Sequence, residues 1–285
     1  MPNNLKLIKK SLKKYFILSL FLLATYSAIG QTDTEKQNLK GSVLSVTQSI
    51  YFAEDSLGNL VKEKVISKAK YTFNTRGFII ESIFDNPDKY QYHLPEKSIT
   101  TYKYDADFKI IETITEEGQE SMRKKYFYTN LGNCIKTKTY NQRTGFLIDK
   151  SEFKYNSKNQ LIAENNTHYA DIINRILNYD ANNNISEEIW NVKIKGEIES
   201  SSYTYKYNKN NLEIESVYKN EEQEISIVTT EYDSANNPIL KTNDGTICKY
   251  KYTFDAQNNW TQCIQTIDSI KYMITEREIT YHLKE

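Results

Sequence analysis

The sequence has few of the residues on which the commonest catalytic and metal sites depend. Among 285 residues there are three cysteines, three histidines and nine glycines. Three cysteines are too few for a small domain framed by disulfides, and their odd number leaves at least one thiol unpaired unless it pairs between chains. The histidines (His93, His168 and His282) lie far apart, without the spacing of metal ligands. The chain also has no glycine-rich phosphate loop, nucleophile elbow or Cys-x-x-Cys motif. We therefore predict a protein that is not an enzyme and that holds no cofactor or metal.

The chain also lacks an excess of charge of one sign. It has 37 basic and 37 acidic residues. Five of the lysines lie in the first thirty residues, and without that segment 32 basic groups face 37 acidic ones, a formal charge of −5. So mild an excess gives no general attraction to nucleic acid or to an anionic membrane. We expect neither as a partner.

The first thirty residues have the pattern of a cleaved secretory signal peptide. Lysines at positions 6–14 precede the apolar stretch "FILSLFLLA" at 16–24, and the small residues Ala28 and Gly30 follow. The apolar stretch is shorter than the roughly 20 residues that span a bilayer. We predict cleavage after Gly30, a polar lead-in at 31–40, and a secreted, periplasmic or cell-surface product that does not span the membrane. An uncleaved N-terminal anchor is the alternative.

Eight stretches of the chain repeat one pattern, and "YKYNKNNLEIES" at 205–216 is one copy. The second aromatic residue of each copy is taken as its anchor, and successive anchors lie about 26 residues apart. The residue after the anchor is Asp or Asn except at Thr129, and the fourth residue after it is Gly or Asn except at Phe108. The anchors are Phe73, Tyr104, Tyr128, Tyr155, Tyr179, Tyr207, Tyr232 and Phe254.

This spacing of turn residues predicts a β-hairpin in every copy. Asp or Asn opens a type I turn, and Gly or Asn three residues later suits the left-handed residue that follows such a turn. A second set of turn signals, such as Glu117-Gly118 and Asp244-Gly245, lies between the copies. The 23 tyrosines also favour strands. We predict an all-β fold in which residues 41–285 form one domain of about 8–9 antiparallel hairpins, with roughly 16 to 20 strands.

Two registers are open for these hairpins. In the first, which we favour, a three-residue loop places the anchor opposite the residue six positions later, which is apolar in every copy except at Glu213. In the second, a four-residue loop places the first aromatic residue of the copy opposite the seventh residue after the anchor, where isoleucine recurs. A shift of one residue exchanges the two faces of a strand. In the copy at 205–216, Glu213 stands where the others have an apolar residue, so we expect a local bulge or register shift there.

The first register assigns residues to faces of the sheet. It places Cys134 and Trp260 in the core, and it places Cys248 and Cys263 on opposite faces, where they cannot form a disulfide. Four glutamates stand eight positions after their anchors and would lie on the same face as the residue six positions after the anchor. Three lysines stand just before their anchors and would lie on the face opposite the tyrosines. Charge on both faces counts against an outer-membrane barrel. The glutamates are Glu81, Glu112, Glu187 and Glu215, and the lysines are Lys103, Lys154 and Lys206.

The repeat, with copies such as "NYDANNNI" at 178–185 and "TFDAQNNW" at 253–260, resembles the YD repeat of the RHS/YD-repeat family. The likeness extends over most of the chain from about Val43. It implies a β-sheet that spirals into a hollow shell, which larger members use to enclose a toxic segment or to support adhesion. This chain is shorter than a complete shell should need and has no toxin-like segment after the last repeat. We carry over the curved or spiralling sheet and not toxin delivery.

Little in the sequence marks a binding site. The turn carboxylates, such as Asp105 and Asp180, are a full repeat apart, so we expect each to bond its own turn and not calcium. The loop "NPDKYQYHLPEKS" at 86–98 makes the longest interval between anchors. Its Tyr90, Tyr92 and His93 are candidate binding residues, as is Trp190, which the first register places on the face opposite Tyr179. An ordinary insertion and a tryptophan that covers a neighbouring strand are the plainer explanations.

Together these features predict a secreted, non-enzymatic scaffold of the bacterial cell envelope that binds a glycan or a protein partner. The alternative is an outer-membrane β-barrel or another structural protein of the envelope.

Overall fold

The computed structural model describes residues 32–86, 95–169 and 171–283. Within these ranges the chain forms one short helix and eighteen strands. The elements are α2 (Asp33–Lys36), β1 (Val43–Ser56), β2 (Asn59–Phe73), β3 (Ile79–Asp85), β4 (Lys97–Tyr104), β5 (Ile110–Glu117), β6 (Glu120–Tyr128), β7 (Cys134–Asn141), β8 (Leu147–Tyr155), β9 (Leu161–His168), β10 (Asp171–Tyr179), β11 (Ile185–Ile194), β12 (Glu197–Tyr207), β13 (Glu213–Asn220), β14 (Ile225–Tyr232), β15 (Pro238–Asn243), β16 (Thr246–Phe254), β17 (Trp260–Ile267) and β18 (Lys271–Tyr281). The predicted signal peptide lies outside the described residues.

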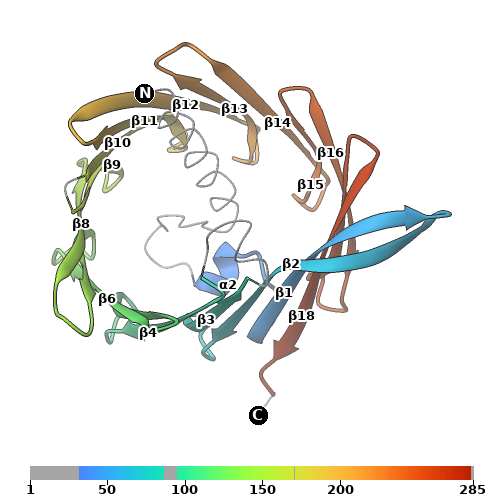
Figure 1. The fold of residues 1–285 in the computed structure, drawn as a ribbon, viewed down its shortest axis with the longest axis horizontal. Helices are drawn as coiled ribbons and strands as arrows, with labels where there is room; N and C mark the ends of the chain where they lie inside the picture. Colours follow the sequence, from blue (N-terminus) through green and yellow to red (C-terminus); the bar gives the residue numbers. More distant parts are fainter. Residues whose placement is uncertain (1–31, 87–94, 170, 284–285) are drawn as a thin grey trace.

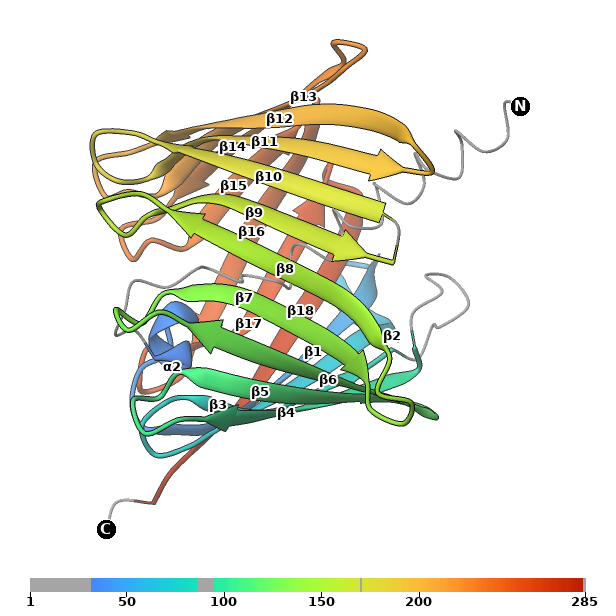
Figure 2. The same cartoon turned by 90° about the vertical axis from the view of Figure 1, so that its left-hand side faces the viewer.

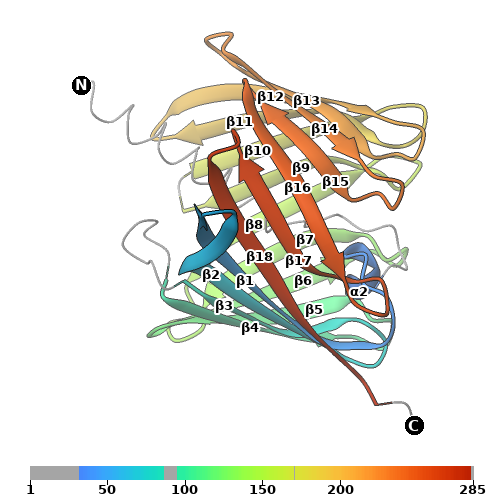
Figure 3. The same cartoon turned by 90° about the vertical axis from the view of Figure 1, so that its right-hand side faces the viewer.

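The strands form a closed barrel. Each strand pairs antiparallel with its neighbours in the sequence, and β1 also pairs with β18. Figure 1 looks into the resulting ring, Figure 2 shows the tilted strands of one wall, and Figure 3 shows the wall where β16–β18 return beside β1. The all-β antiparallel meander of 16 to 20 strands is confirmed. The prediction of a curved or spiralling sheet is wrong, because the pairing of the first strand with the last leaves no open edge. The alternative prediction, an outer-membrane β-barrel, has this closed architecture.

The repeated turns form one rim of the barrel. The residue four positions after each anchor has a left-handed backbone in all eight copies, from Gly77 (φ 84°) to Asn258 (φ 61°), and even Phe108 adopts it (φ 61°). In seven copies the side-chain oxygen of the first turn residue accepts hydrogen bonds from two backbone amides; Asp180, for example, accepts from Asn182 and Asn184, both at 2.8 Å. The turn aspartates therefore bond their own turns, as predicted.

All eight repeat hairpins have the first of the two registers. Tyr207 pairs with Glu213, for example, but the adjoining pair is Lys206 with Glu215, so Ile214 is an extra residue in its strand. The same register shift accompanies every anchor. The bulge expected in the copy at 205–216 is therefore present, but this copy is not exceptional, because the bulge is a part of the repeat.

The bulge inverts the faces of all residues beyond it. Trp190 pairs with Arg175, which alternates with Leu177 and Tyr179 on one face of β10. Trp190 therefore shares the face of Tyr179, and its predicted placement on the opposite face is wrong. The predicted face of the four glutamates is wrong for the same reason: Glu112 pairs with Lys103 and Glu215 with Lys206. The four are Glu81, Glu112, Glu187 and Glu215, and they lie on the face of the lysines.

The anchors face the inside of the barrel. The helix α2 lies within the ring in Figure 1, and its Asp33 accepts hydrogen bonds from the Ile79 amide (2.8 Å) and the Tyr104 hydroxyl (3.4 Å). Around this contact Leu39, Val43, Val46, Phe73 and Ile79 form a buried cluster. The predicted lead-in thus contains an ordered helix that packs on the inner wall. None of the helices in the described ranges is long and apolar enough to cross a bilayer.

The outer face of the barrel carries the cross-strand charges. Lys206 and Glu215 form an ion pair of 2.7 Å, and Glu152 pairs with Lys150 (2.7 Å) and Lys136 (3.5 Å). Exposed pairs of this kind contribute about 0–1 kcal/mol each, so they add little to the stability of the barrel.

Candidate functional site: the aromatic inner wall

A ladder of tyrosine hydroxyls fastens each repeat hairpin to the one before it. Six anchors donate a hydrogen bond to the backbone carbonyl of the residue that faces the preceding anchor. These bonds join Tyr104 to Ile79 (2.6 Å), Tyr128 to Ile110 (2.7 Å), Tyr155 to Cys134 (2.8 Å), Tyr179 to Leu161 (2.7 Å), Tyr207 to Ile185 (2.8 Å) and Tyr232 to Glu213 (2.7 Å). A phenylalanine could fill the same space but not make the bond, which explains the preference for tyrosine.

The tyrosines of the inner wall are partly buried. Burial raises the pKa of Tyr71, Tyr155 and Tyr203 to about 12. The neutral phenol is favoured in such surroundings because ionisation would place a charge in a region of low polarity. The tyrosines are therefore uncharged apolar surface with a hydroxyl at one end.

A second aromatic group, the Trp190 cluster, lies on the inner face of β10–β13 and consists of Arg175, Glu188, Trp190, Tyr203 and Tyr218. Arg175 donates two hydrogen bonds to Glu188, of 2.6 Å and 3.1 Å, and the Trp190 indole donates a third (3.2 Å). The Arg175 guanidinium also lies 5.1 Å from the centre of the Trp190 ring. Tyr203, opposite Glu188, packs on Tyr218 with ring centres 4.9 Å apart.

The Trp190 cluster is a fixed platform. The charge of Arg175 is neutralised by Glu188, and the indole N–H is satisfied, so the ring cannot rotate without breaking a charge-assisted bond. Trp190 and Tyr203 keep part of their surface accessible, while Glu188 is buried. Flat rings held this way present contact area at little entropic cost, as binding surfaces do.

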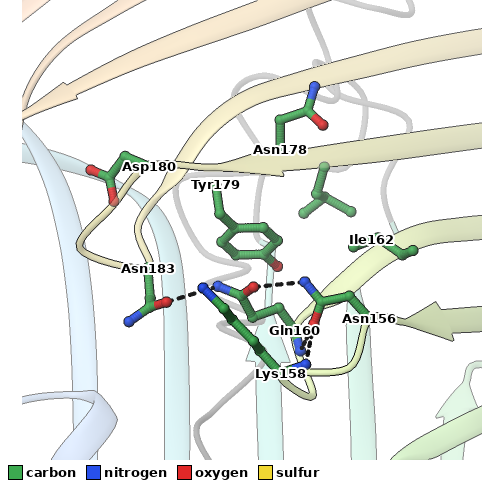
Figure 4. Close-up of a pocket in the computed structure, with 9 residues that line it drawn as sticks. Asn156, Lys158, Gln160, Ile162, Asn178, Tyr179, Asp180 and Asn183 are labelled. Atoms are coloured by element: carbon green, nitrogen blue, oxygen red, sulfur yellow. Dashed lines mark hydrogen bonds between the residues drawn. The ribbon is translucent and has the colours of Figure 1, made fainter.

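A polar pocket of about 230 Å³ opens beside the rim, between the turns of two successive repeat hairpins. Figure 4 shows the Tyr179 ring at its centre, with Lys158 and Asn183 beside it. Gln160 bridges the two turns through a hydrogen bond to Asn183 (3.2 Å). Amide side chains, Lys158, Asp180 and the Tyr179 ring line this recess.

The structure places only one of the four predicted site residues. Trp190 lies on the inner wall, as described, whereas Tyr90, Tyr92 and His93 fall outside the described residues. Arg175, Glu188 and Tyr203 were missed because the bulge had not been recognised. Adjacent apolar residues such as Ile79-Ile80 and Leu161-Ile162 mark the bulge in the sequence, since one points inward and the next outward.

The cysteines lie within this wall. Cys134, Cys248 and Cys263 are unpaired. Cys263 faces Tyr252, and Cys248 lies on the same face as Tyr252 four residues earlier in β16. Their predicted placement on opposite faces is therefore wrong, but they still cannot bond, because four residues along the strand separate them. In the part of the chain that is described, no cluster of three or more His, Cys, Asp or Glu side chains could hold a metal.

No family model matches the chain, and neither does any curated protein. Among solved structures, a porin-like protein from Bacteroides uniformis is 12% identical with a TM-score of 0.41, over 85% of this chain and 98% of that one. A porin-like protein from Bacteroides vulgatus has 12% identity and a TM-score of 0.32, over 66% and 95% of the two chains. The complex TcdB2-TccC3-Cdc42 has 11% identity and a TM-score of 0.22, over 79% of this chain but 19% of that one. At such low TM-scores, no inference about function rests on these similarities.

Proposed function

We propose that this chain is a non-enzymatic barrel of the bacterial cell envelope that stands in water and binds a saccharide on its inner wall. The observation that carries the proposal is the separation of residue types by the barrel wall. Tyrosines and Trp190 face inward, whereas lysines and glutamates such as Lys206 and Glu215 pair on the outer face. That arrangement gives an aromatic interior that also holds the Arg175–Glu188 pair, and an exterior on which charged pairs lie among exposed apolar residues such as Ile176.

A saccharide fits the Trp190 cluster for two reasons. The faces of sugar rings carry C–H groups that pack on flat aromatic surface, which Trp190, Tyr203 and Tyr218 supply. Sugar hydroxyls need donors and acceptors at the edge of that surface, and Ser201, which faces Trp190 across the strands, provides one. The rim pocket beside Tyr179 adds amide groups of the same character.

The second candidate is an outer-membrane β-barrel, and closure of the sheet is the observation that favours it. Closure removes the free edges that a bilayer would not tolerate. Against it stand the outward lysines in the middle of their strands, such as Lys125, Lys138 and Lys150, at about 2–4 kcal/mol each near the bilayer midplane. Three such residues already cost on the order of 10 kcal/mol, so we rank this candidate second.

Fractionation separates the two candidates. The mature protein, expressed with its own leader, is expected in the periplasm, in the medium or in a membrane fraction from which alkaline carbonate releases it. Retention in carbonate-washed outer membranes, together with heat-modifiable migration on gels, would establish the second candidate instead.

Binding is tested on a glycan array with Trp190→Ala and Trp190→Phe. Loss of a central aromatic anchor is expected to weaken binding by about tenfold or more, and the phenylalanine is expected to restore part of it. Phe127→Ala is the matched control, because Phe127 is an accessible aromatic residue on the outer face. Equal binding by the wild type and Trp190→Ala would refute the inner-wall site, and so would equal losses in Trp190→Ala and Phe127→Ala.

A further inference from the structure

The inner wall contains two arginine–tryptophan pairs that differ in their charge balance. In the first, Arg175 stacks on Trp190 and is neutralised by Glu188. In the second, Arg277 of β18 lies on Trp260 of β17, its guanidinium carbon 3.5 Å from the centre of the indole ring. The two pairs have the same stacking chemistry, so the difference between them lies in what balances the cation.

Uncharged side chains surround the second pair. The Arg277 Nε donates a 3.0 Å hydrogen bond to the side-chain oxygen of Gln48, its cross-strand partner in β1. Tyr71 and Tyr252 approach from β2 and β16, and Cys263 from β17. Within the described ranges, no aspartate or glutamate forms an ion pair with Arg277, whereas Arg175 has one at 2.6 Å.

The groups around Arg277 do not supply a negative charge at neutral pH. Burial raises the pKa of Tyr71 to about 12 and that of Cys263 to about 11, so both are protonated. Burial also lowers the pKa of Arg277 to about 10, which still leaves the guanidinium charged. A partly buried cation surrounded by neutral groups is costly unless an anion balances it.

We propose that the Arg277–Trp260 pair is the receptor for a carboxylate group of the saccharide, so that the ligand is a uronate-containing oligosaccharide. A guanidinium can bind a carboxylate through two parallel N–H groups, while its stem and face remain stacked on the indole. The Trp260 ring and the hydroxyls of Tyr71 and Tyr252 then lie beside the sugar ring that carries the carboxylate. This inference rests on the proposed function, because it names the class of saccharide that the inner wall takes.

The test compares one oligosaccharide in two forms by calorimetry. A short oligogalacturonate is titrated into the mature wild-type protein, and so is the same oligosaccharide after its carboxylates have been reduced to alcohols. The charged form is expected to bind at least about tenfold more tightly, as for a charge-assisted pair. Arg277→Gln should abolish that difference. Arg277→Lys should keep part of the difference.

Arg143→Gln is the matched control, since Arg143 is exposed in a turn of the barrel, and its preference for the charged form is expected to be that of the wild type. Folding of Arg277→Gln is checked by its thermal midpoint, which should be equal or higher because an unbalanced charge is removed.

Three outcomes overturn the inference. One is equal affinity for the two forms while Trp190→Ala still weakens binding, which leaves the proposed function standing. Another is a preference for the charged form that persists in Arg277→Gln. The third is binding of poly-glutamate at Arg277 with no binding of either saccharide, which identifies an acidic peptide ligand and defeats the proposed function as well.

Discussion

The hydroxyl of Tyr155 donates a 2.8 Å hydrogen bond to the carbonyl oxygen of Cys134 in the preceding hairpin. The bulge beside each anchor interrupts the regular ladder of backbone bonds at this level of the barrel. The tyrosine hydroxyl therefore adds a hydrogen bond between hairpins at the level where the regular ladder is interrupted. Six bonds of this kind join seven successive hairpins, so the repeat sequence stabilises the contacts between hairpins and not only each hairpin itself.

Tyr155→Phe should lower the free energy of unfolding by about 0.5–1.5 kcal/mol, the net worth of one hydrogen bond, with a larger loss if the buried carbonyl stays unsatisfied. The measurement is the midpoint of chemical denaturation followed by circular dichroism. Tyr140→Phe is the control, because Tyr140 lies on the outer face opposite Arg123. Equal effects of the two substitutions would show that the ladder bond adds no stability.

The turn glycines differ in what surrounds them. Gly77 and Gly132 occupy the same turn position, with φ of 84° and 86°. A Cβ at Gly77 would overlap the side chain of Thr34 in α2, whereas one at Gly132 would meet only the flexible Lys109 side chain at 3.3 Å. Gly77→Asn should therefore destabilise the protein and free the segment at 32–42 for proteolysis. Gly132→Asn should be tolerated, since asparagine takes this position in five other copies. Matching proteolysis rates for the two variants would contradict the tight contact.

The repeat turns and their register could be predicted from the sequence because both depend on a few neighbouring residues. Asp180 and Asn183 fix a turn by local bonds, and the anchor then faces the residue six positions on. Closure could not be predicted in this way, because it depends on the pairing of β1 with β18 at opposite ends of the chain. The side chains after each bulge were assigned to the wrong face of the sheet, because a single extra residue, such as Ile214, exchanges the two faces for all later residues of its strand.

The helix α2 had a signal in the sequence that was missed. Thr32 and Glu35 form a capping box, in which the Thr32 hydroxyl accepts from the Glu35 amide (3.3 Å) and the Glu35 carboxylate accepts from the Thr32 amide (2.7 Å). The pattern Thr-x-x-Glu marks a helix start. No local pattern could show that Asp33 accepts a hydrogen bond from Tyr104, the anchor of a repeat hairpin.

Alkaline pH should unfold the barrel through its tyrosines. Burial raises the pKa of Tyr71, Tyr155 and Tyr203 to about 12, above the ordinary value of 10.0. Between these values the unfolded chain releases protons that the folded chain retains, so the stability falls as the pH rises from 10 towards 12. Below pH 10 the contribution is complete. Ultraviolet absorbance should show tyrosinate forming together with the loss of circular dichroism. Full ionisation of these tyrosines in a folded barrel would contradict their burial.

The thiols offer a test of the inner face. Burial raises the pKa of Cys134, and it raises that of Cys263 to about 11. Since the thiolate is the reactive form, iodoacetamide at pH 8 should modify folded Cys263 very slowly, and it should modify all three cysteines at ordinary rates in urea without reductant. Peptide mass spectrometry measures each site. A disulfide between Cys248 and Cys263, or rapid modification of folded Cys263, would contradict the structure.

One buried asparagine reinforces the seam at which the barrel closes. Asn259, 2% exposed, accepts from the Lys40 amide (2.7 Å) and donates to the Lys40 carbonyl (2.9 Å) and to the Tyr281 hydroxyl (2.8 Å). It thus ties the segment before β1 to the end of β18. Asn237, at the same position of the preceding copy, bonds only Asp233 of its own turn.

Asn259→Ala leaves the amide and carbonyl of Lys40 without partners, at a cost of about 1–3 kcal/mol, whereas Asn237→Ala should cost about 1 kcal/mol or less. Because the loss falls on the seam between β1 and β18, Asn259→Ala should also speed hydrogen exchange in those two strands well before the rest of the barrel opens. Exchange measured by mass spectrometry decides the matter. Uniform acceleration over all strands would mean that the barrel opens as one cooperative unit and that the seam is not its weakest joint.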